Sequence, residues 1–181
     1  MDILQIYIDK DMPDEVKNYM VTVKKYLPKA THYFVGDRSN VPPESIWLDP
    51  IQEQQKAKQV LGHGFWWNLY CTENKYSADM IRLAWAVKNP DLFYVDADVE
   101  FIKAPVITKS DLPLIGINND FQEFFLFYTN NACDWFSKLV DKTVKGKAFP
   151  SAFMGVFGDI KLGRCLIMPD TFKNNSFFVR H

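Results

Sequence analysis

The chain has 181 residues, of which 48% are hydrophobic, 15% aromatic and 24% charged. This composition excludes a disordered chain, because the apolar fraction is large enough to form a core, and the length fits one domain. The 21 basic and 22 acidic residues nearly balance, so the chain lacks the excess positive charge that holds nucleic acid. We therefore expect a single compact domain over residues 1–181 that does not bind nucleic acid.

The cysteines and the N-terminal residues predict a compartment. Cys71, Cys133 and Cys165 are widely spaced and form neither a C-x-x-C pair nor a disulfide framework, which is typical of a reducing environment. The first residues lack the features of a signal peptide, and no uncharged apolar run approaches the roughly 18 residues of a membrane span. We expect a cytoplasmic protein without a membrane span.

The first third of the chain has the pattern of a parallel βαβ unit. Residues 3–8 form a nearly continuous apolar run, typical of a strand that is buried on both faces. Apolar residues at helical spacing follow over 16–27, and Pro28 ends this helix. Short strands are predicted over 32–35 and 46–48, and the succession of strand, helix and strand indicates parallel pairing.

The rest of the chain continues the alternation. A polar segment over 50–61 predicts an exposed helix that ends at Gly62, and a strongly aromatic segment follows over 64–70. A second amphipathic helix is predicted over 75–88, with Asn74 or Ser77 as its N-cap. The remaining elements are a helix over 132–144 and strands over 92–95, 114–117, 124–128, 152–157, 165–168 and 177–179. This order predicts an α/β fold with a mostly parallel central sheet and helices on both faces.

The predicted strand over 92–95 leads directly into Asp96-Ala97-Asp98. Open α/β sheets bind ligands at the carboxyl ends of their strands, and two carboxylates one residue apart can turn toward one hard cation. An isolated D-x-D is more often a solvated acidic loop. The apolar strand that directly precedes the D-x-D of this chain favours a ligand site instead.

Two other carboxylate motifs fail on the sequence itself. An EF-hand loop that starts at Asp96 would need glycine at position 101 and glutamate at position 107, where this chain has Phe101 and Ile107. A phosphatase of the haloacid-dehalogenase type would need threonine or valine at position 100, which is Glu100 here. That motif would also be expected near the N-terminus, whereas Asp96 lies past the middle of this chain.

The segment Ser77–Arg82 (SADMIR), followed by Phe93–Glu100 (FYVDADVE), resembles the "ASDxxR … YxDxDxx" block of glycosyltransferase family 32. This family carries a DXD sugar-binding motif, includes Golgi-type mannosyltransferases and is similar to the glucosyltransferase domains of large bacterial toxins. The specific match covers residues 76–103. The family usually has a Gly-Gly pair before the strand, where this chain has Asn89-Pro90-Asp91.

The resemblance implies a single-domain GT-A fold, which is Rossmann-like, and roles for four residues. Asp79 and Arg82 lie three residues apart, hence on one helix face, and would contact the sugar of the donor, although a surface ion pair would have the same spacing. Asp96 would contact the ribose, or the metal through water, and Asp98 would bind the divalent cation, Mn²⁺ or Mg²⁺. Asp96, Asp98 and Arg82 would carry the catalysis.

Two further site residues are expected from their position. His181 follows a short apolar run, and many GT-A enzymes are similar in placing a C-terminal histidine on the metal; we include it as a metal ligand. Tyr7 ends the first strand, where the nucleotide base lies in this architecture, so we include it in the donor site. His32 and His63 have the sequence context of structural residues.

The resemblance implies a metal-dependent enzyme that moves a hexose from UDP- or GDP-hexose to a hydroxyl of a saccharide, a lipid-linked or a protein acceptor, with retention of configuration. If the enzyme instead inverted, Asp120 or Glu123 would have to accept the acceptor proton. The alternative is a non-catalytic α/β module that binds a nucleotide-sugar or a metal. The length favours the alternative, because 181 residues is small for a GT-A enzyme.

Overall fold

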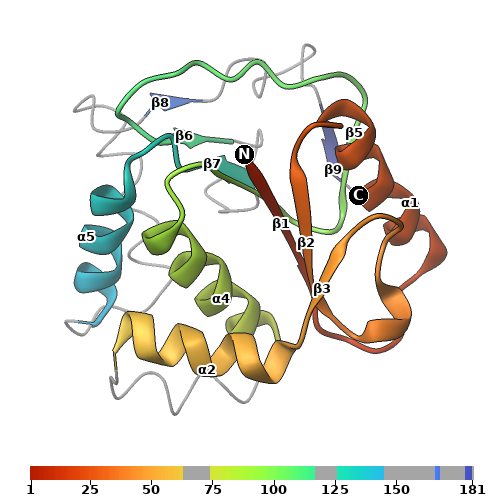
Figure 1. Ribbon diagram of the computed structural model, residues 1–181, viewed down its shortest axis with the longest axis horizontal. Helices are drawn as coiled ribbons and strands as arrows, with labels where there is room; N and C mark the ends of the chain where they lie inside the picture. The colour runs from red at the N-terminus through yellow and green to blue at the C-terminus, as the bar shows by residue number, and fades with distance from the viewer. Residues whose placement is uncertain (63–73, 117–125, 145–165, 168–177, 181) are drawn as a thin grey trace.

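The computed structural model describes residues 1–62, 74–116, 126–144, 166–167 and 178–180 (Figure 1). Its strands are β1 (Asp2–Tyr7), β2 (Thr31–Gly36), β3 (Ile46–Leu48), β4 (Leu92–Val95), β5 (Val99–Phe101), β6 (Leu114–Ile115), β7 (Leu126–Tyr128), β8 (Leu166–Ile167) and β9 (Phe178–Arg180). Its helices are α1 (Asp14–Tyr26), α2 (Pro50–Leu61), α4 (Asn74–Lys88) and α5 (Cys133–Val144), with a 3-10 turn η1 (Arg38–Asn40).

Seven of these strands form one sheet in the order β3-β2-β1-β4-β7-β6-β8. The first four are parallel to one another, and Ile3 of β1 lies between His32 of β2 and Phe93 of β4. Strand β7 runs antiparallel to both of its neighbours, and β8 is parallel to β6. The predicted mostly parallel sheet is therefore confirmed. Strands β5 and β9 form a separate antiparallel pair.

Helices cover both faces of the sheet, as predicted (Figure 1). Alternate residues of β1 point to opposite faces. Leu4 packs in one cluster with Met80 and other residues of α2, α4 and α5, whereas Ile3 packs in another cluster with Val23 of α1. Burial on both faces explains the continuous apolar run of this strand. Within the described ranges, no helix has the length and apolarity to cross a membrane.

Helix α2 has the predicted boundaries, because both ends have strong local signals. The Asp49 side chain accepts hydrogen bonds from the amides of Ile51 and Gln52, at 2.8 and 3.1 Å, and Pro50 occupies the first turn. At the other end, Gly62 has a φ of 80°, a conformation that favours glycine and stops helices.

The predicted exposure of α2 is wrong for one face, which packs against α4. Glu53, Ala57 and Leu61 are buried there. The Glu53 carboxylate accepts hydrogen bonds from Trp85 Nε1 at 2.8 Å and from Lys56 Nζ at 2.6 Å. A carboxylate with such partners can be buried, which composition alone does not reveal.

Other differences are local. Strand β5 was not predicted, because it has three residues and its partner β9 lies far along the chain. Ser77 is buried inside α4, so its predicted role as a cap is wrong. Strand β9 lies one residue later than expected. The predicted strand over 152–157, the aromatic segment 64–70 and His63 fall outside the described residues.

His32 is structural, as expected. It lies on β2 with 1% of its surface exposed, and its Nδ1 is 2.8 Å from Ser45 Oγ. Burial, together with the positive charge of Lys24, lowers the pKa of His32 from 6.5 to about 4. The imidazole is therefore neutral at neutral pH.

This pKa shift predicts a pH-dependent stability. Between about pH 6.5 and pH 4 the unfolded chain binds a proton at His32 that the folded chain does not, so the free energy of unfolding falls as the pH falls. Urea titrations should show that the wild type loses about 2 kcal/mol more than His32→Asn between roughly pH 7 and pH 5. The carboxylates are common to both proteins and cancel in this difference. Equal losses would mean that His32 titrates normally in the fold.

Candidate functional site

The D-A-D segment forms a tight turn between β4 and β5. All four residues of β4 are buried, and the turn closes with a hydrogen bond from the Val99 amide to the Asp96 carbonyl at 3.3 Å. Asp96 and Asp98 are both half-buried. A rigid, doubly covered strand thus holds two carboxylates at the carboxyl edge of the parallel sheet, where ligands bind in open α/β folds.

Arg82 of α4 joins the two parts of the predicted motif. Its guanidinium forms an ion pair with Asp79, one turn earlier on the helix, and lies 3.3 Å from Asp96 Oδ1. Only 8% of Arg82 is exposed. Burial alone would lower the pKa of Arg82, but the negative charges of Asp79 and Asp96 hold this pKa above its usual value. The guanidinium therefore stays charged.

Tyr94 is a site residue that the sequence reasoning missed. Its hydroxyl donates to Asp96 Oδ1 at 2.5 Å, and the Arg82 guanidinium lies 5.2 Å from the centre of its ring. Burial and the charge of Asp96 raise the pKa of Tyr94 well above its usual value, so the hydroxyl keeps its proton and its donor role. The signal was the i, i+2 spacing, which places Tyr94 and Asp96 on one face at the end of a strand.

The second carboxylate, Asp98, lies beside the last described strand. Its Oδ1 atom is buried, and the next residue, Val99, pairs with Arg180 of β9. Antiparallel pairing therefore brings the end of β9 next to the D-A-D turn. His181 directly follows Arg180 in the sequence and is itself outside the described residues.

Strand β5, on which β9 depends, is anchored to α1. The Phe101 amide donates to Thr22 Oγ1 at 2.7 Å. The Phe101 ring is buried and packs edge-on against Phe93, with 6.0 Å between the ring centres. The D-A-D turn is thus fixed by β4, which precedes it, and by β5, which follows it and is anchored to α1.

Tyr7 lies at the same edge of the sheet. It is half-buried against a cluster that contains Ala97, the central residue of the D-A-D turn, and its hydroxyl donates to the Asp11 carbonyl at 3.3 Å. Gly36 pairs with Tyr7, and a Cβ atom at Gly36 would overlap the Tyr7 carbonyl oxygen. Glycine therefore allows the ends of β1 and β2 to approach each other.

Strand β3 adds an aromatic side chain that the sequence reasoning did not single out. Trp47 Nε1 donates to the Gly36 carbonyl at 2.9 Å, and the Arg38 guanidinium lies 5.3 Å from the centre of the Trp47 ring. Tyr7 and Trp47 pack against the same buried cluster. The ring of Tyr7, which was predicted as a site residue, and the ring of Trp47, which was not, thus both lie at the edge formed by β1, β2 and β3.

The donor atoms at this edge suit a hard divalent cation. Carboxylate oxygen is the ligand type that Mg²⁺ and Mn²⁺ prefer. Among the described residues there is no group of three potential metal ligands, and Asp96 and Asp98 are the two carboxylates of the D-A-D turn that could hold such an ion. One oxygen of Asp96 accepts from both Tyr94 and Arg82.

Comparisons with known proteins identify the fold. No protein-family model matches the sequence, and no curated protein matches it significantly. Among solved structures, the PaToxG glycosyltransferase matches with a TM-score of 0.60 and 17% identity, over 88% of this chain and 69% of that one. Apo mouse xyloside xylosyltransferase 1 matches with a TM-score of 0.51 and 11% identity, over 93% and 84%. A cysteine-to-serine mutant of a transferase matches with a TM-score of 0.56 and 10% identity, over 99% of this chain and 91% of that one.

The chain has the GT-A fold. The α/β prediction is thereby confirmed. In this GT-A chain, the carboxyl edge of the sheet brings together Asp79, Arg82, Asp96 and Asp98, with Tyr7 on the neighbouring strand. Asp120 and Glu123 lie outside the described residues.

The contact between Tyr94 and Asp96 predicts a stability effect. Tyr94→Phe removes one hydrogen bond to a charged acceptor and leaves the ring in place, so the free energy of unfolding should fall by about 1–3 kcal/mol. Chemical denaturation measures this loss. Tyr33→Phe, at a half-buried tyrosine of β2, is the matched control and should change stability by less than about 1 kcal/mol. Equal effects of the two substitutions would refute a special role of the Tyr94 hydroxyl.

Proposed function

We propose that this chain is a metal-dependent glycosyltransferase that transfers a hexose from a nucleotide-diphosphate sugar to an acceptor hydroxyl. The observation that carries the proposal is the position of Arg82. Its guanidinium connects Asp79 with Asp96, so the two blocks of the family 32 resemblance, which are separate in the sequence, meet at one place. That place is the carboxyl edge of a sheet with the GT-A fold.

Each residue at this edge has a role in the proposal. Asp98 holds Mn²⁺ or Mg²⁺ directly, and Asp96 faces the ribose or a water on the metal. Asp79 and Arg82 face the hexose, and Tyr7 lies against the base. When bound, the cation supplies the positive charge that neutralises the departing nucleoside diphosphate.

The buried hydrogen bonds make this site rigid before a donor binds. Tyr94 and Arg82 both donate to one oxygen of Asp96, which fixes the rotamer of this carboxylate. A group that is already oriented costs little to reorganise when charge develops on the donor. Asp79 is 22% exposed and Arg82 only 10% at its side chain, so Asp79 reaches the hexose more readily, and Arg82 positions its two carboxylates in addition to facing the hexose.

The proposal extends to features that rest on the resemblance. We place the chain with family 32, with UDP- or GDP-hexose as donor, a saccharide, lipid-linked or protein hydroxyl as acceptor, and retention of the anomeric configuration. We also propose a cytoplasmic location, from the wide spacing of the three cysteines in the sequence.

Donor hydrolysis separates the enzyme from a non-catalytic module. We expect slow Mn²⁺-dependent release of hexose from one or more UDP- or GDP-hexoses, because a competent site passes the sugar to water when no acceptor is bound. The release is followed by NMR, and the first-formed anomer reports retention or inversion. Metal-dependent binding of a nucleotide-sugar without any hydrolysis would contradict the enzyme and support the binding module.

Asp98→Asn tests the metal ligand. The amide is a weaker ligand for a hard cation than the carboxylate, so nucleotide-sugar binding should lose its dependence on Mn²⁺ and hydrolysis should cease. Calorimetric titration with and without Mn²⁺ measures this, and the circular dichroism spectrum should stay unchanged. Asp111→Asn, at an exposed aspartate before β6, is the matched control. Wild-type metal dependence in Asp98→Asn would exclude Asp98 as a ligand.

His181→Ala tests the role of the last residue. The register of β5 and β9 ends with Arg180 beside Val99, one residue from Asp98, which supports a histidine ligand on the same ion. We expect a weaker affinity for Mn²⁺ in the hydrolysis assay, by about tenfold, as for the loss of one ligand or its support. The melting temperature without ligands should be that of the wild type. Unchanged Mn²⁺ dependence would remove His181 from the metal site.

A further inference from the structure

Asp96 and Asp98, the two carboxylates of the D-A-D turn, are held in different ways. Asp96 accepts hydrogen bonds from the side chains of Tyr94 and Arg82. Asp98 directly precedes Val99, the first residue of β5, so the position of its carboxylate depends on where β5 lies. The contacts of this short strand therefore decide how well the proposed direct metal ligand is placed.

Strand β5 lies between β9 and α1. It pairs with β9, and α1 packs against it (Figure 1). The Phe101 amide donates to Thr22 Oγ1 at 2.7 Å. An amide has a single hydrogen, so this one faces α1 and not β9. A strand of three residues forms few ladder hydrogen bonds, and each further contact of its backbone therefore matters for its position.

The Thr22 hydroxyl is oriented for this contact by its own helix. It donates its proton to the Tyr19 carbonyl, one turn earlier in α1, at 2.6 Å, a common contact of threonine in helices. A hydroxyl has one proton and two lone pairs, so Thr22 Oγ1 is left as an acceptor. The oxygen thus has both the direction and the chemistry that the Phe101 amide needs.

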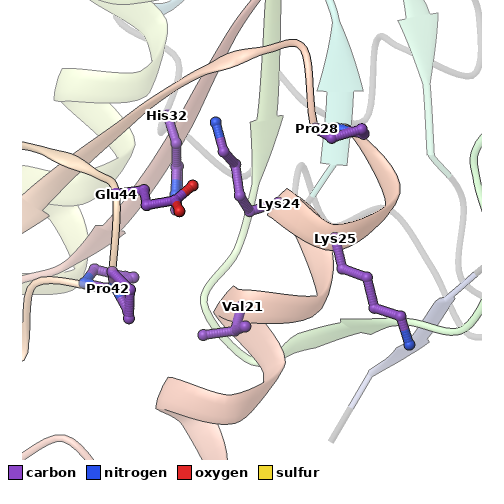
Figure 2. Close-up of a pocket in the computed structure, with 8 residues that line it drawn as sticks. Val21, Lys24, Lys25, Pro28, His32, Pro42 and Glu44 are labelled. Carbon is purple, nitrogen blue, oxygen red and sulfur yellow. The ribbon is translucent and has the colours of Figure 1, made fainter.

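Apolar contacts lie beside this hydrogen bond. Val23, the next residue of α1, is fully buried in one cluster with two residues of β5. Val21, on the other side of Thr22, is 44% exposed and lines a pocket of about 340 Å³ between α1 and the segment 42–44 (Figure 2). Thr22 and Val23 therefore attach α1 to β5, and Val21 is a neighbouring position that faces solvent.

We propose that Thr22 is a positioning residue for the metal side of the site: its hydroxyl oxygen fixes β5 and thereby the carboxylate of Asp98. The inference rests on the proposed function, because it assumes a divalent cation at the D-A-D turn. Thr22 does not touch the cation and acts through the Phe101 amide and the backbone of β5. Asp96 does not depend on Thr22, because the partners of Asp96 lie on α4 and β4.

Hydrogen exchange tests the anchor without metal or donor. Thr22→Val removes the acceptor and keeps the branched shape of the side chain. The Phe101 amide then loses its partner, so β5 should open more often than the centre of the sheet. Measured by NMR, exchange of the Phe101 amide relative to that of Phe93 in β4 should become faster by about tenfold, the factor for one such hydrogen bond. Unchanged relative exchange would overturn the proposal.

Titration with Mn²⁺ alone measures the metal site in the same samples. Bound Mn²⁺ should broaden the NMR signals of residues 96–99 in a saturable way. Thr22→Val should weaken this binding by about tenfold, the low end of the losses for outer partners of metal ligands. Thr22→Ser keeps the hydroxyl and should bind Mn²⁺ like the wild type.

Two control variants separate positioning from stability. Thr129 Oγ1 accepts from the Leu92 amide at 2.8 Å, at the opposite end of β4. Thr129→Val therefore loses the same kind of hydrogen bond, and it should lower the stability while the affinity for Mn²⁺ stays that of the wild type. Val21→Thr is the reverse exchange at the exposed neighbour of Thr22, and it should also leave the affinity unchanged.

The outcomes distinguish this inference from the proposed function. Equal losses of Mn²⁺ affinity in Thr22→Val and Thr129→Val would reflect stability alone and would overturn the inference. An unchanged affinity in Thr22→Val would also overturn it, and the proposed function would then stand. A wild type without saturable broadening would instead refute the metal site of the proposed function, and with it the role of Thr22.

Discussion

The buried guanidinium of Arg82 is the constraint on which the carboxyl edge of the sheet depends. An uncompensated charge at this depth would cost several kcal/mol, so Arg82 requires both Asp79 and Asp96. That requirement ties α4 to the end of β4. Tyr94 adds a second donor to the same oxygen of Asp96, and its ring lies beneath the guanidinium. The position of Asp96, the first D-A-D carboxylate, is thus determined by three other side chains: Arg82 and Tyr94 directly, and Asp79 through Arg82.

The sheet supplies the rigidity that this cluster needs. Strand β4 lies at the centre of the sheet, between β1 and β7, and it is buried on both faces. Motion of the D-A-D turn is limited further because β5 begins within it and is bound to Thr22 of α1. The functional proposal therefore rests on a carboxylate pair that the fold holds in place before any ligand arrives.

The sequence predicts the elements whose signals are local. The ends of α2 follow from Asp49, Pro50 and Gly62, and β4 follows from its apolar run before Asp96. The order of strands and helices also sufficed for the α/β class and the mostly parallel sheet. These features depend on residues that lie close together in the chain, so composition and spacing are enough to predict them.

The parts that sequence reasoning missed depend on tertiary contacts. The buried face of α2 depends on Trp85 meeting Glu53, and β5 depends on a partner almost 80 residues later. The spacing of Asp79 and Arg82 fits an exposed ion pair equally well, and only the fold shows that the pair is buried against Tyr94. Strand spacing could have singled out Tyr94 as the companion of Asp96.

One measurement tests the account most directly: the melting temperature of the wild-type protein with a panel of UDP- and GDP-sugars, each with Mn²⁺ and with a chelator. A ligand that binds only the folded state raises the apparent stability by mass action. The account predicts that at least one nucleotide-sugar raises the melting temperature in Mn²⁺ and loses this effect in chelator. A panel in which no nucleotide-sugar acts, or in which the chelator makes no difference, would contradict a metal-dependent donor site at the carboxyl edge of this sheet.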